Sequence, residues 1–358
     1  MQMGINPDLL VVARNWRGLS QTALSSRLGI TQGHLSKIEN GIIAPDEKVL
    51  NAMTTVLDVP AALLHSPDRV YGAPMSVHAM FRKKADVGKK SVEAVIAELN
   101  VCLVGLRALL KSVDLQAAAV LPRYDIEDYE MSPGDIAENV RRAWQLPNGP
   151  IRNLIQAIED AGVIVFPLDM QGASIDAVTL SVPDLPPCIF FNRNKPADRI
   201  RFSIAHELGH LVMHRQPSST MEQEANEFAA ELLLPAREFV ASVSERVDLA
   251  ELARLKQIWK VSMQAALYRL SSLKVISYNQ NVYLNKLINK HGYRRSEPAS
   301  TEFPHEVPVT FEQVKNLHLS DLGYSVVELQ ELLKVNAEDF KAIYGLAVGA
   351  VRRLAVVK

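Results

Sequence analysis

The chain has 358 residues, 48% of them hydrophobic, which is the composition of an ordinary globular protein of two or three domains. Its formal net charge of −1 gives no overall electrostatic argument for a nucleic-acid partner. Two cysteines, Cys102 and Cys188, exclude a disulfide framework, and the lack of a signal peptide and of any run of ~18 apolar residues predicts a cytoplasmic protein without membrane contact.

Residues 7–64 show the pattern of a group of short helices. Ser20 and Thr31 are good N-cap residues, and each stands directly before a run that can form a helix. Gly29 supplies the turn between these two runs, and Gly41 stands where a glycine often ends a helix. The expected helices cover residues 9–16, 21–28, 32–40, 46–57 and 60–64.

Two of these helices resemble a DNA-reading motif. The pattern Ser20-Gln21-x-x-Leu24-x-x-x-Leu28-Gly29-Ile30-Thr31-Gln32-x-x-Leu35-Ser36-Lys37-Ile38-Glu39-Asn40-Gly41 resembles the Cro/repressor-type helix-turn-helix. Such a motif places its second helix in the major groove of double-stranded DNA. Gln32 could hydrogen-bond to adenine, and Lys37 to guanine or a phosphate. Gln21, at the start of its helix, is placed for a phosphate contact. The expected DNA-binding residues are Gln21, Thr31, Gln32, Gly33, Ser36 and Lys37.

The charge of this N-terminal region argues against strong phosphate attraction. Residues 1–64 hold five basic and five acidic side chains, and a net charge of zero is poor for binding the DNA backbone. A helix-turn-helix used for dimerisation or for docking a partner protein therefore stays open. A homodimer with local basic patches would remove the objection.

Residues 65–90 are expected to be a linker that leads to a long helix. The linker contains prolines and a glycine and ends in the basic runs Arg82-Lys83-Lys84 and Lys89-Lys90, which suit either a solvated segment or a nucleic-acid contact. Apolar residues then recur at helical spacing over residues 91–116, which predicts an amphipathic helix.

The rest of the chain alternates between helical and strand patterns. Short apolar runs at 163–166 and 188–191 predict strands, and 275–278 is a further possible strand. Residues 296–308 are polar and contain prolines, which indicates a loop, and three short helices are expected after it. The other expected helices cover residues 133–144, 151–161, 197–214, 221–233, 248–258 and 262–271.

A metal-binding pattern lies in the expected helix 197–214. The sequence reads His206-Glu207-Leu-Gly-His210, and residues i and i+4 of a helix share one face about 6 Å apart. Two imidazoles on that face can converge on one Zn²⁺, and Glu207 is then placed to take a proton from the water that the metal activates. The apolar neighbours of the motif disfavour the alternative of two surface histidines.

A catalytic zinc needs a third protein ligand and an open position, and several residues compete for that role. His214 continues the same helix face but lies about 12 Å from His206 along the axis, which is too far for a single ion. The next helix offers Glu222, with Glu224 as its rival. Asn226 shares a face with Glu222 and can hydrogen-bond a ligand imidazole. The expected metal ligands are His206, His210 and Glu222.

These motifs together resemble a known family. His206–His210, the run Glu222–Pro235 and the lead-in Asn192–Phe202 are similar to the ImmA/IrrE family of zinc metallopeptidases, over roughly residues 130–280. Leu234 stands where that family often has methionine. The resemblance implies a gluzincin-like core with two histidines and one glutamate on zinc. It also implies regulated proteolysis of a transcriptional repressor, or a role beside a mobile element or a toxin–antitoxin pair.

A second helix-turn-helix pattern lies at residues 252–276. The ImmA/IrrE family often carries such a segment behind its peptidase core. We favour a packing role for this segment over a second DNA reader. Residues 300–358 show no motif.

The sequence as a whole predicts an α+β fold that is mostly α. We expect a DNA-binding transcriptional regulator whose zinc endopeptidase site cleaves a protein substrate, namely a partner repressor. The alternative is a repressor or antitoxin-type regulator that does not cleave, and whose zinc domain senses a signal or binds a partner. The expected parts are a helix-turn-helix domain at 1–66, a linker and long helix at 67–130, a zincin-like metallopeptidase domain with a small sheet at 131–285, and a helical region of unknown role at 286–358.

Overall fold

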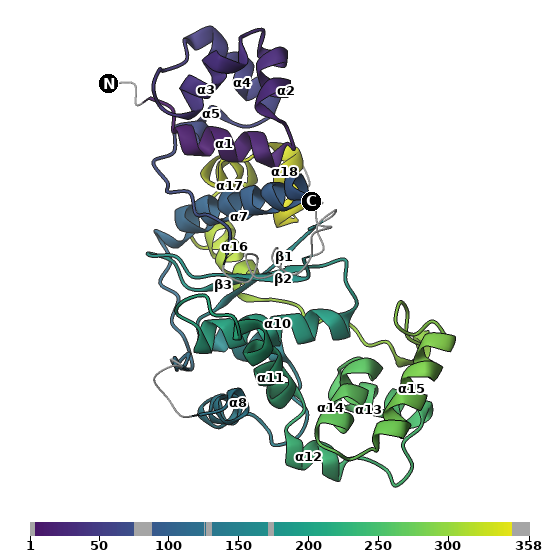
Figure 1. Cartoon of the computed structure of the whole chain (residues 1–358). Helices are drawn as coiled ribbons and strands as arrows, with labels where there is room; N and C mark the ends of the chain where they lie inside the picture. Colours follow the sequence, from purple (N-terminus) through teal and green to yellow (C-terminus); the bar gives the residue numbers. More distant parts are fainter. Residues whose placement is uncertain (1–3, 75–87, 125, 127–130, 171–174, 346–358) are drawn as a thin grey trace, which may run out of the picture.

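The computed structural model describes residues 4–74, 88–124, 126, 131–170 and 175–345, which form a mostly helical molecule around one small sheet. Figure 1 shows an N-terminal group of helices at one end, the sheet in the middle and a second group of helices at the other end. The expected α+β class with a large helical share is confirmed. In the part of the chain described, no helix has the length and apolar character that a membrane crossing needs. The basic run at 82–84 lies outside the described residues.

The N-terminal group consists of five short helices, and the two of the helix-turn-helix motif begin at the expected caps. The side chain of Ser20 accepts a hydrogen bond from the backbone N–H of Ala23, and that of Thr31 accepts one from His34, both at 3.1 Å. Gly29 ends the first motif helix with a φ of 68°, which favours glycine. The helices are α1 (Pro7–Trp16), α2 (Gln21–Leu28), α3 (Gln32–Glu39), α4 (Glu47–Leu57) and α5 (Ala61–Leu64).

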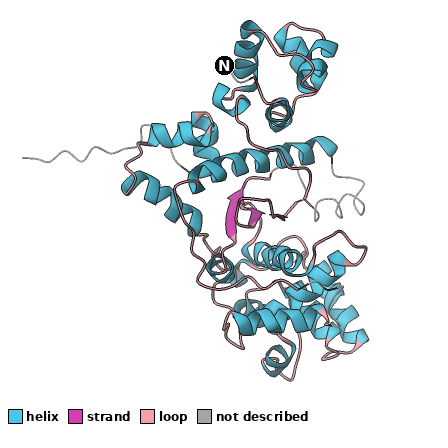
Figure 2. Cartoon of the chain, turned by 90° about the vertical axis from the view of Figure 1, so that its left-hand side faces the viewer, coloured by secondary structure: helices cyan, strands magenta, loops and turns pink. Residues whose placement is uncertain are grey.

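The sheet has the strand order β1-β3-β2, in which β1 (Ile164–Leu168) lies parallel and β2 (Ala177–Leu180) antiparallel to β3 (Cys188–Asn192). Side chains alternate between the two faces of a sheet, so Phe190 enters one hydrophobic core while Ile189 enters the other. Figure 2 shows the strands between two layers of helices. The sequence predicts β1 and β3 but not β2.

One face of the sheet is covered by α7 (Lys89–Leu110) and the C-terminal helices. The expectation of an amphipathic α7 is wrong for its second half, because Leu99 to Leu106 are buried on every side. The helix packs against α1 on one side and against two C-terminal helices on the other, and it ends at residue 110 rather than 116. The C-terminal helices are α16 (Thr310–Ser320), α17 (Val326–Leu333) and α18 (Ala337–Tyr344).

The C-terminal helices also hold the N-terminal group in place. Arg17 pairs with the carboxylate of Asp339 through two hydrogen bonds of 2.5 and 3.0 Å. Asn336 donates to the backbone carbonyl of Asp58 at 2.8 Å. The region after residue 286, for which the sequence indicates no role, therefore links the helix-turn-helix to the sheet.

The other face of the sheet is covered by α10 (Ala197–Met213), which packs against β2 and β3. The strand considered at 275–278 is wrong, because Ser277 and Gln280 form a capping box that begins a helix which the sequence does not predict. The helices around α10 are α8 (Pro133–Ala143), α9 (Leu154–Asp160), α11 (Met221–Leu233), α12 (Ala236–Ala241), α13 (Leu249–Trp259), α14 (Met263–Ser272) and α15 (Tyr278–Lys290).

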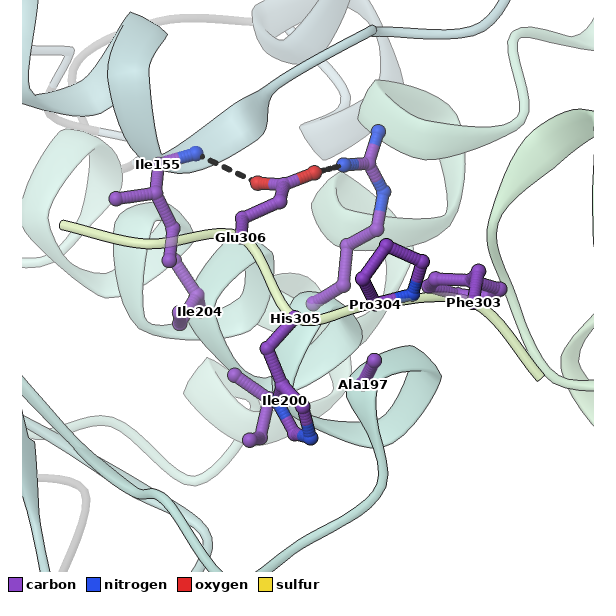
Figure 3. Close-up of a pocket in the computed structure, with 9 residues that line it drawn as sticks. Ile155, Ala197, Ile200, Ile204, Phe303, Pro304, His305 and Glu306 are labelled. Carbon is purple, nitrogen blue, oxygen red and sulfur yellow. Dashed lines mark hydrogen bonds and ion pairs between the residues drawn. The ribbon is translucent and has the colours of Figure 1, made fainter.

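A loop after α15 fixes the N-terminal half of α10 (Figure 3). Glu306 accepts a hydrogen bond from the backbone N–H of Ile155 at 2.9 Å and pairs with the buried guanidinium of Arg201. Burial lowers the pKa of Arg201 to about 10, so this group stays charged at neutral pH. Phe303 and Pro304 of the same loop lie against α10. The helix that carries the metal-binding pattern is thus held by the sheet on one side and by this loop on another.

Candidate metal centre

Helix α10 directs two imidazoles toward one another. His206 and His210 are one turn apart, and their Nε2 atoms lie 3.0 Å from each other. His210 is almost fully buried, whereas His206 keeps 15% of its side chain exposed. Burial, together with the nearby His210, lowers the pKa of His206 to about 4. His206 is therefore neutral at pH 7 and has a nitrogen lone pair to offer to a cation.

Helix α11 brings one carboxylate to these two imidazoles. The Glu222 carboxylate lies 3.3 Å from Nε2 of His210 and 3.8 Å from Nε2 of His206, and one ligand atom from each of the three residues lies within 4.8 Å of the others. Ligand atoms around a tetrahedral zinc with bonds of ~2.0–2.1 Å are spaced about 3.3 Å apart. The three residues therefore match zinc both in spacing and in their donor set of two nitrogens and one oxygen.

The far nitrogens of both imidazoles contact polar side chains. His206 Nδ1 lies 3.1 Å from Asn226 Oδ1, and the amide of Asn226 donates to the backbone carbonyl of Glu222 at 2.7 Å. His210 Nδ1 lies 3.0 Å from His214 Nδ1, and the other nitrogen of His214 lies 3.0 Å from the Glu224 carboxylate. Glu224, the rival for the third ligand position, thus contacts His214.

One arrangement of protons satisfies the contacts that Asn226, His214 and Glu224 make on the far side of the two imidazoles, and leaves no proton between the two Nε2 atoms. The Nδ1–H of His206 donates to Asn226. The Nδ1–H of His210 donates to His214, whose Nε2–H in turn donates to Glu224. Both candidate ligand imidazoles, those of His206 and His210, then carry a lone pair on Nε2, on the side where the Glu222 carboxylate lies. This is the tautomer that a metal requires, and outer hydrogen bonds of this kind fix the ring orientation.

We expect the substitution Asn226→Ala to weaken zinc binding by roughly 10–100-fold, because His206 loses the acceptor that sets its tautomer and ring orientation. Competition with a chromogenic chelator measures this change. Asn51→Ala, at an exposed asparagine of α4, is the matched control and should leave zinc affinity unchanged. Equal zinc affinities for the two variants would contradict a role for Asn226 in orienting His206.

Glu207 directly follows His206 in the chain and is only 4% exposed. Its backbone carbonyl accepts a hydrogen bond from Thr179 Oγ1 at 3.2 Å. Because Thr179 belongs to β2, this bond ties the motif helix to an edge strand of the sheet. The strand that the sequence does not predict therefore lies directly beside the candidate metal centre.

Gly209 sets how closely the two site helices approach, a role that the sequence pattern does not reveal. A Cβ atom added to Gly209 would lie 3.0 Å from a ring carbon of Phe228 and 3.3 Å from the Cα of Ala225. Both neighbours belong to α11, which also carries Glu222. The lack of a side chain at this position therefore allows the carboxylate to reach the imidazoles. The signal in the sequence is a glycine inside a helix, which is unfavourable there without a packing reason.

The expected DNA-binding residues lie on and beside α3. Thr31, Gln32, Gly33 and Lys37 are exposed, and Ser36 is partly exposed. The hydroxyl of Thr31 also caps the helix.

Gln21 and Gln32 are connected by a hydrogen bond. Gln32 donates to Gln21 at 2.7 Å, and Gln21 donates to the buried carboxylate of Glu39 at 2.6 Å. Arg14 pairs with the same carboxylate at 2.6 Å. This network holds the Gln32 side chain in one orientation at the start of α3, where a recognition helix contacts base edges.

Comparison with known protein families agrees with both parts of the chain. Residues 12–64 match the helix-turn-helix model, and residues 158–271 match the model of the IrrE N-terminal-like domain, a metallopeptidase-type family. The chain carries an IrrE-like domain behind a helix-turn-helix. The resemblance seen in the sequence is thereby confirmed, and the IrrE-like match includes His206, His210 and Glu222. No curated protein matches the chain.

Proposed function

We propose that this protein is a DNA-binding regulator whose IrrE-like domain is a zinc-dependent endopeptidase that cleaves a partner regulator protein. The observation that carries the proposal is the convergence of His206, His210 and Glu222, whose spacing and donor atoms suit zinc. The helix-turn-helix supports the regulatory part, with double-stranded DNA as the partner and a homodimer as the form that reads it.

The chemistry assigned to the centre is hydrolysis of a peptide bond. Zinc bound here would act as a Lewis acid that polarises a peptide carbonyl and acidifies water. Glu207 is the general base: its carboxylate takes a proton from the attacking water and later delivers that proton to the leaving amine. Water adds to the carbonyl carbon, the C–N bond breaks, and a carboxylate and an amine are released.

The edge strand beside the centre suits a peptide substrate. β2 pairs with β3 on one side only, and no described strand lies on its other side. A strand edge that is not paired with another strand offers backbone N–H and C=O groups to which an extended peptide can hydrogen-bond. Because Thr179 of β2 is bonded to the backbone of Glu207, a peptide added to this edge would run past the general base. This arrangement favours an endopeptidase over a hydrolase of small molecules.

The first test incubates the zinc-loaded full chain with a proteome-derived peptide library and detects cleavage by mass spectrometry. The second test offers it, as substrates, the helix-turn-helix regulators encoded beside its gene. We expect Glu207→Gln to keep zinc and to cleave roughly 10²–10⁴-fold more slowly, since it loses only the general base. Cleavage at the wild-type rate by this variant would assign the activity to a contaminant. A zinc-loaded wild type that cleaves neither substrate would overturn the proposal.

A further inference from the structure

The segment around α13–α15 differs in charge from the rest of the chain. Residues 252–296 contain nine lysine and arginine residues and not a single aspartate or glutamate, in a chain whose formal net charge is −1. The N-terminal helix-turn-helix region, by contrast, has no net positive charge to attract phosphates. Positive charge is therefore concentrated at the end of the molecule that lies opposite the helix-turn-helix (Figure 1).

Part of this positive charge is neutralised inside the fold. Arg254 pairs with Glu251, and Arg269 pairs with the buried Glu231. Lys256 is buried between Asp198 and Glu297. Arg269 and Lys256 are buried, whereas Arg254 keeps 42% of its side chain exposed but is neutralised by Glu251.

Of the other six cations, Lys260 is half-buried and donates to the backbone carbonyl of Arg152, and five lie on the surface. Lys274, Lys286 and Lys290 are exposed, as are the adjacent Arg294 and Arg295. Among the described residues, no carboxylate forms an ion pair with any of the five. Like charges on such a surface repel one another in the free protein, and a bound polyanion would relieve this repulsion.

Helix α15 places two of these charges, Lys286 and Lys290, on one face, and the other three lie just before and just after the helix in the sequence. Asn279, Tyr283, Lys286 and Lys290 stand at i, i+4, i+7 and i+11, so they form one stripe along a helix of about 20 Å. The side chain of Tyr283 is 60% exposed, and that of the nearby Tyr278 is 79% exposed. Lysine, arginine, tyrosine and asparagine are residue types that hydrogen-bond to the phosphates of DNA. We call the following six residues the α15 surface: Lys274, Tyr283, Lys286, Lys290, Arg294 and Arg295.

Helix α14 does not take the role of a second recognition helix. Met263 at its start is buried, as are Ala266, Leu267 and Leu270, which pack into the core of the IrrE-like domain. A recognition helix needs exposed side chains at its N-terminal end to reach base edges. The helix-turn-helix pattern at 252–276 therefore serves packing, and the exposed chemistry belongs to the next helix.

We propose that the α15 surface binds the phosphate backbone of double-stranded DNA without reading its sequence. The helix-turn-helix reads bases but contributes little phosphate attraction, and the α15 surface supplies that attraction from the opposite end of the chain. An acidic protein would also be attracted to five cations. The three lysines favour the nucleic acid, since lysine is depleted at protein–protein interfaces and is a common donor to DNA phosphates.

The experiment measures binding of the full-length protein to a random-sequence 30-base-pair duplex by fluorescence anisotropy at several salt concentrations. Each phosphate contact contributes about 0.9 to the slope of log affinity against log salt. The α15 variant is the triple substitution Lys286→Gln, Lys290→Gln and Arg294→Gln. We expect its slope of log affinity against log salt to be smaller by roughly two to three units, and its affinity at low salt to be about 10-fold weaker.

The control is the triple substitution Lys111→Gln, Arg142→Gln and Lys341→Gln, which changes the net charge by the same amount. It shows whether weaker DNA binding comes from the α15 surface or from the lower total charge. It should keep most of the wild-type slope, and both variants should have the circular dichroism spectrum of the wild type, because every altered side chain is exposed. An unchanged slope in the α15 variant would overturn the proposal. Loss of poly-L-glutamate binding with unchanged duplex binding would instead assign the surface to an acidic protein.

Discussion

Purified protein in which His210 is replaced by alanine is expected to contain almost no zinc after dialysis, whereas the wild type should contain about one zinc per chain. The imidazole of His210 is almost fully buried and lies within 3.3 Å of both other ligand atoms, so no surface residue can replace it. Zinc that binds only the folded chain stabilises it. We therefore also expect the His210→Ala variant to lose the rise in Tm that added zinc gives the wild type. Elemental mass spectrometry and thermal unfolding measure the two effects.

Three further variants make this result specific. His291→Ala, at an exposed histidine outside the site, should keep its zinc. Glu222→Ala should lose zinc, and Glu224→Ala should keep it with weaker affinity, because Glu224 acts through His214. The reverse order for the two glutamates would make Glu224 the third ligand. Zinc content in the wild type should also fall as the pH is lowered, since protons compete for the imidazoles.

Much of the site can be predicted from the sequence because its determinants are local. The i, i+4 spacing of His206 and His210 fixes their common face wherever the helix lies. The proximity of Glu222 is a tertiary feature, and the sequence offers it only with Glu224 as a rival two residues away. The structure places the two carboxylates on different imidazoles, because residues two apart on a helix point in different directions.

The features that the sequence does not predict depend on long-range packing. β2 is four residues long, and its segment Ala-Val-Thr-Leu becomes a strand by pairing with β3. Helix α7 has an apolar pattern that fits one buried face, yet neighbours cover its stretch Leu99–Leu106 on every side. Residues 310–344 carry no motif, but they pack on α7 and bond to the N-terminal helices. Local periodicity contains no information about which partner covers a face.

Replacing Gly209 by valine is expected to lower the free energy of unfolding by about 1–3 kcal/mol through overpacking and to weaken zinc binding by at least about 10-fold. The Cβ atom alone would stand 3.3 Å from a backbone atom of α11, and valine adds two methyl groups beyond it. Helix α11 must then move away from α10 and carry Glu222 with it. Chemical denaturation and chelator competition measure the two effects.

Gly209→Ala distinguishes this steric cause from a change in helix propensity. Alanine is favoured over glycine inside a helix by about 1 kcal/mol, so propensity alone would make the alanine variant more stable than the wild type. If the close approach of α10 and α11 dominates, Gly209→Ala should instead gain little or no stability and bind zinc more weakly. Gly33→Val in α3, where an added Cβ meets no atom within 4 Å, is the matched control for zinc affinity. A Gly209→Val variant with the zinc affinity of the wild type would show that the helix spacing does not position Glu222.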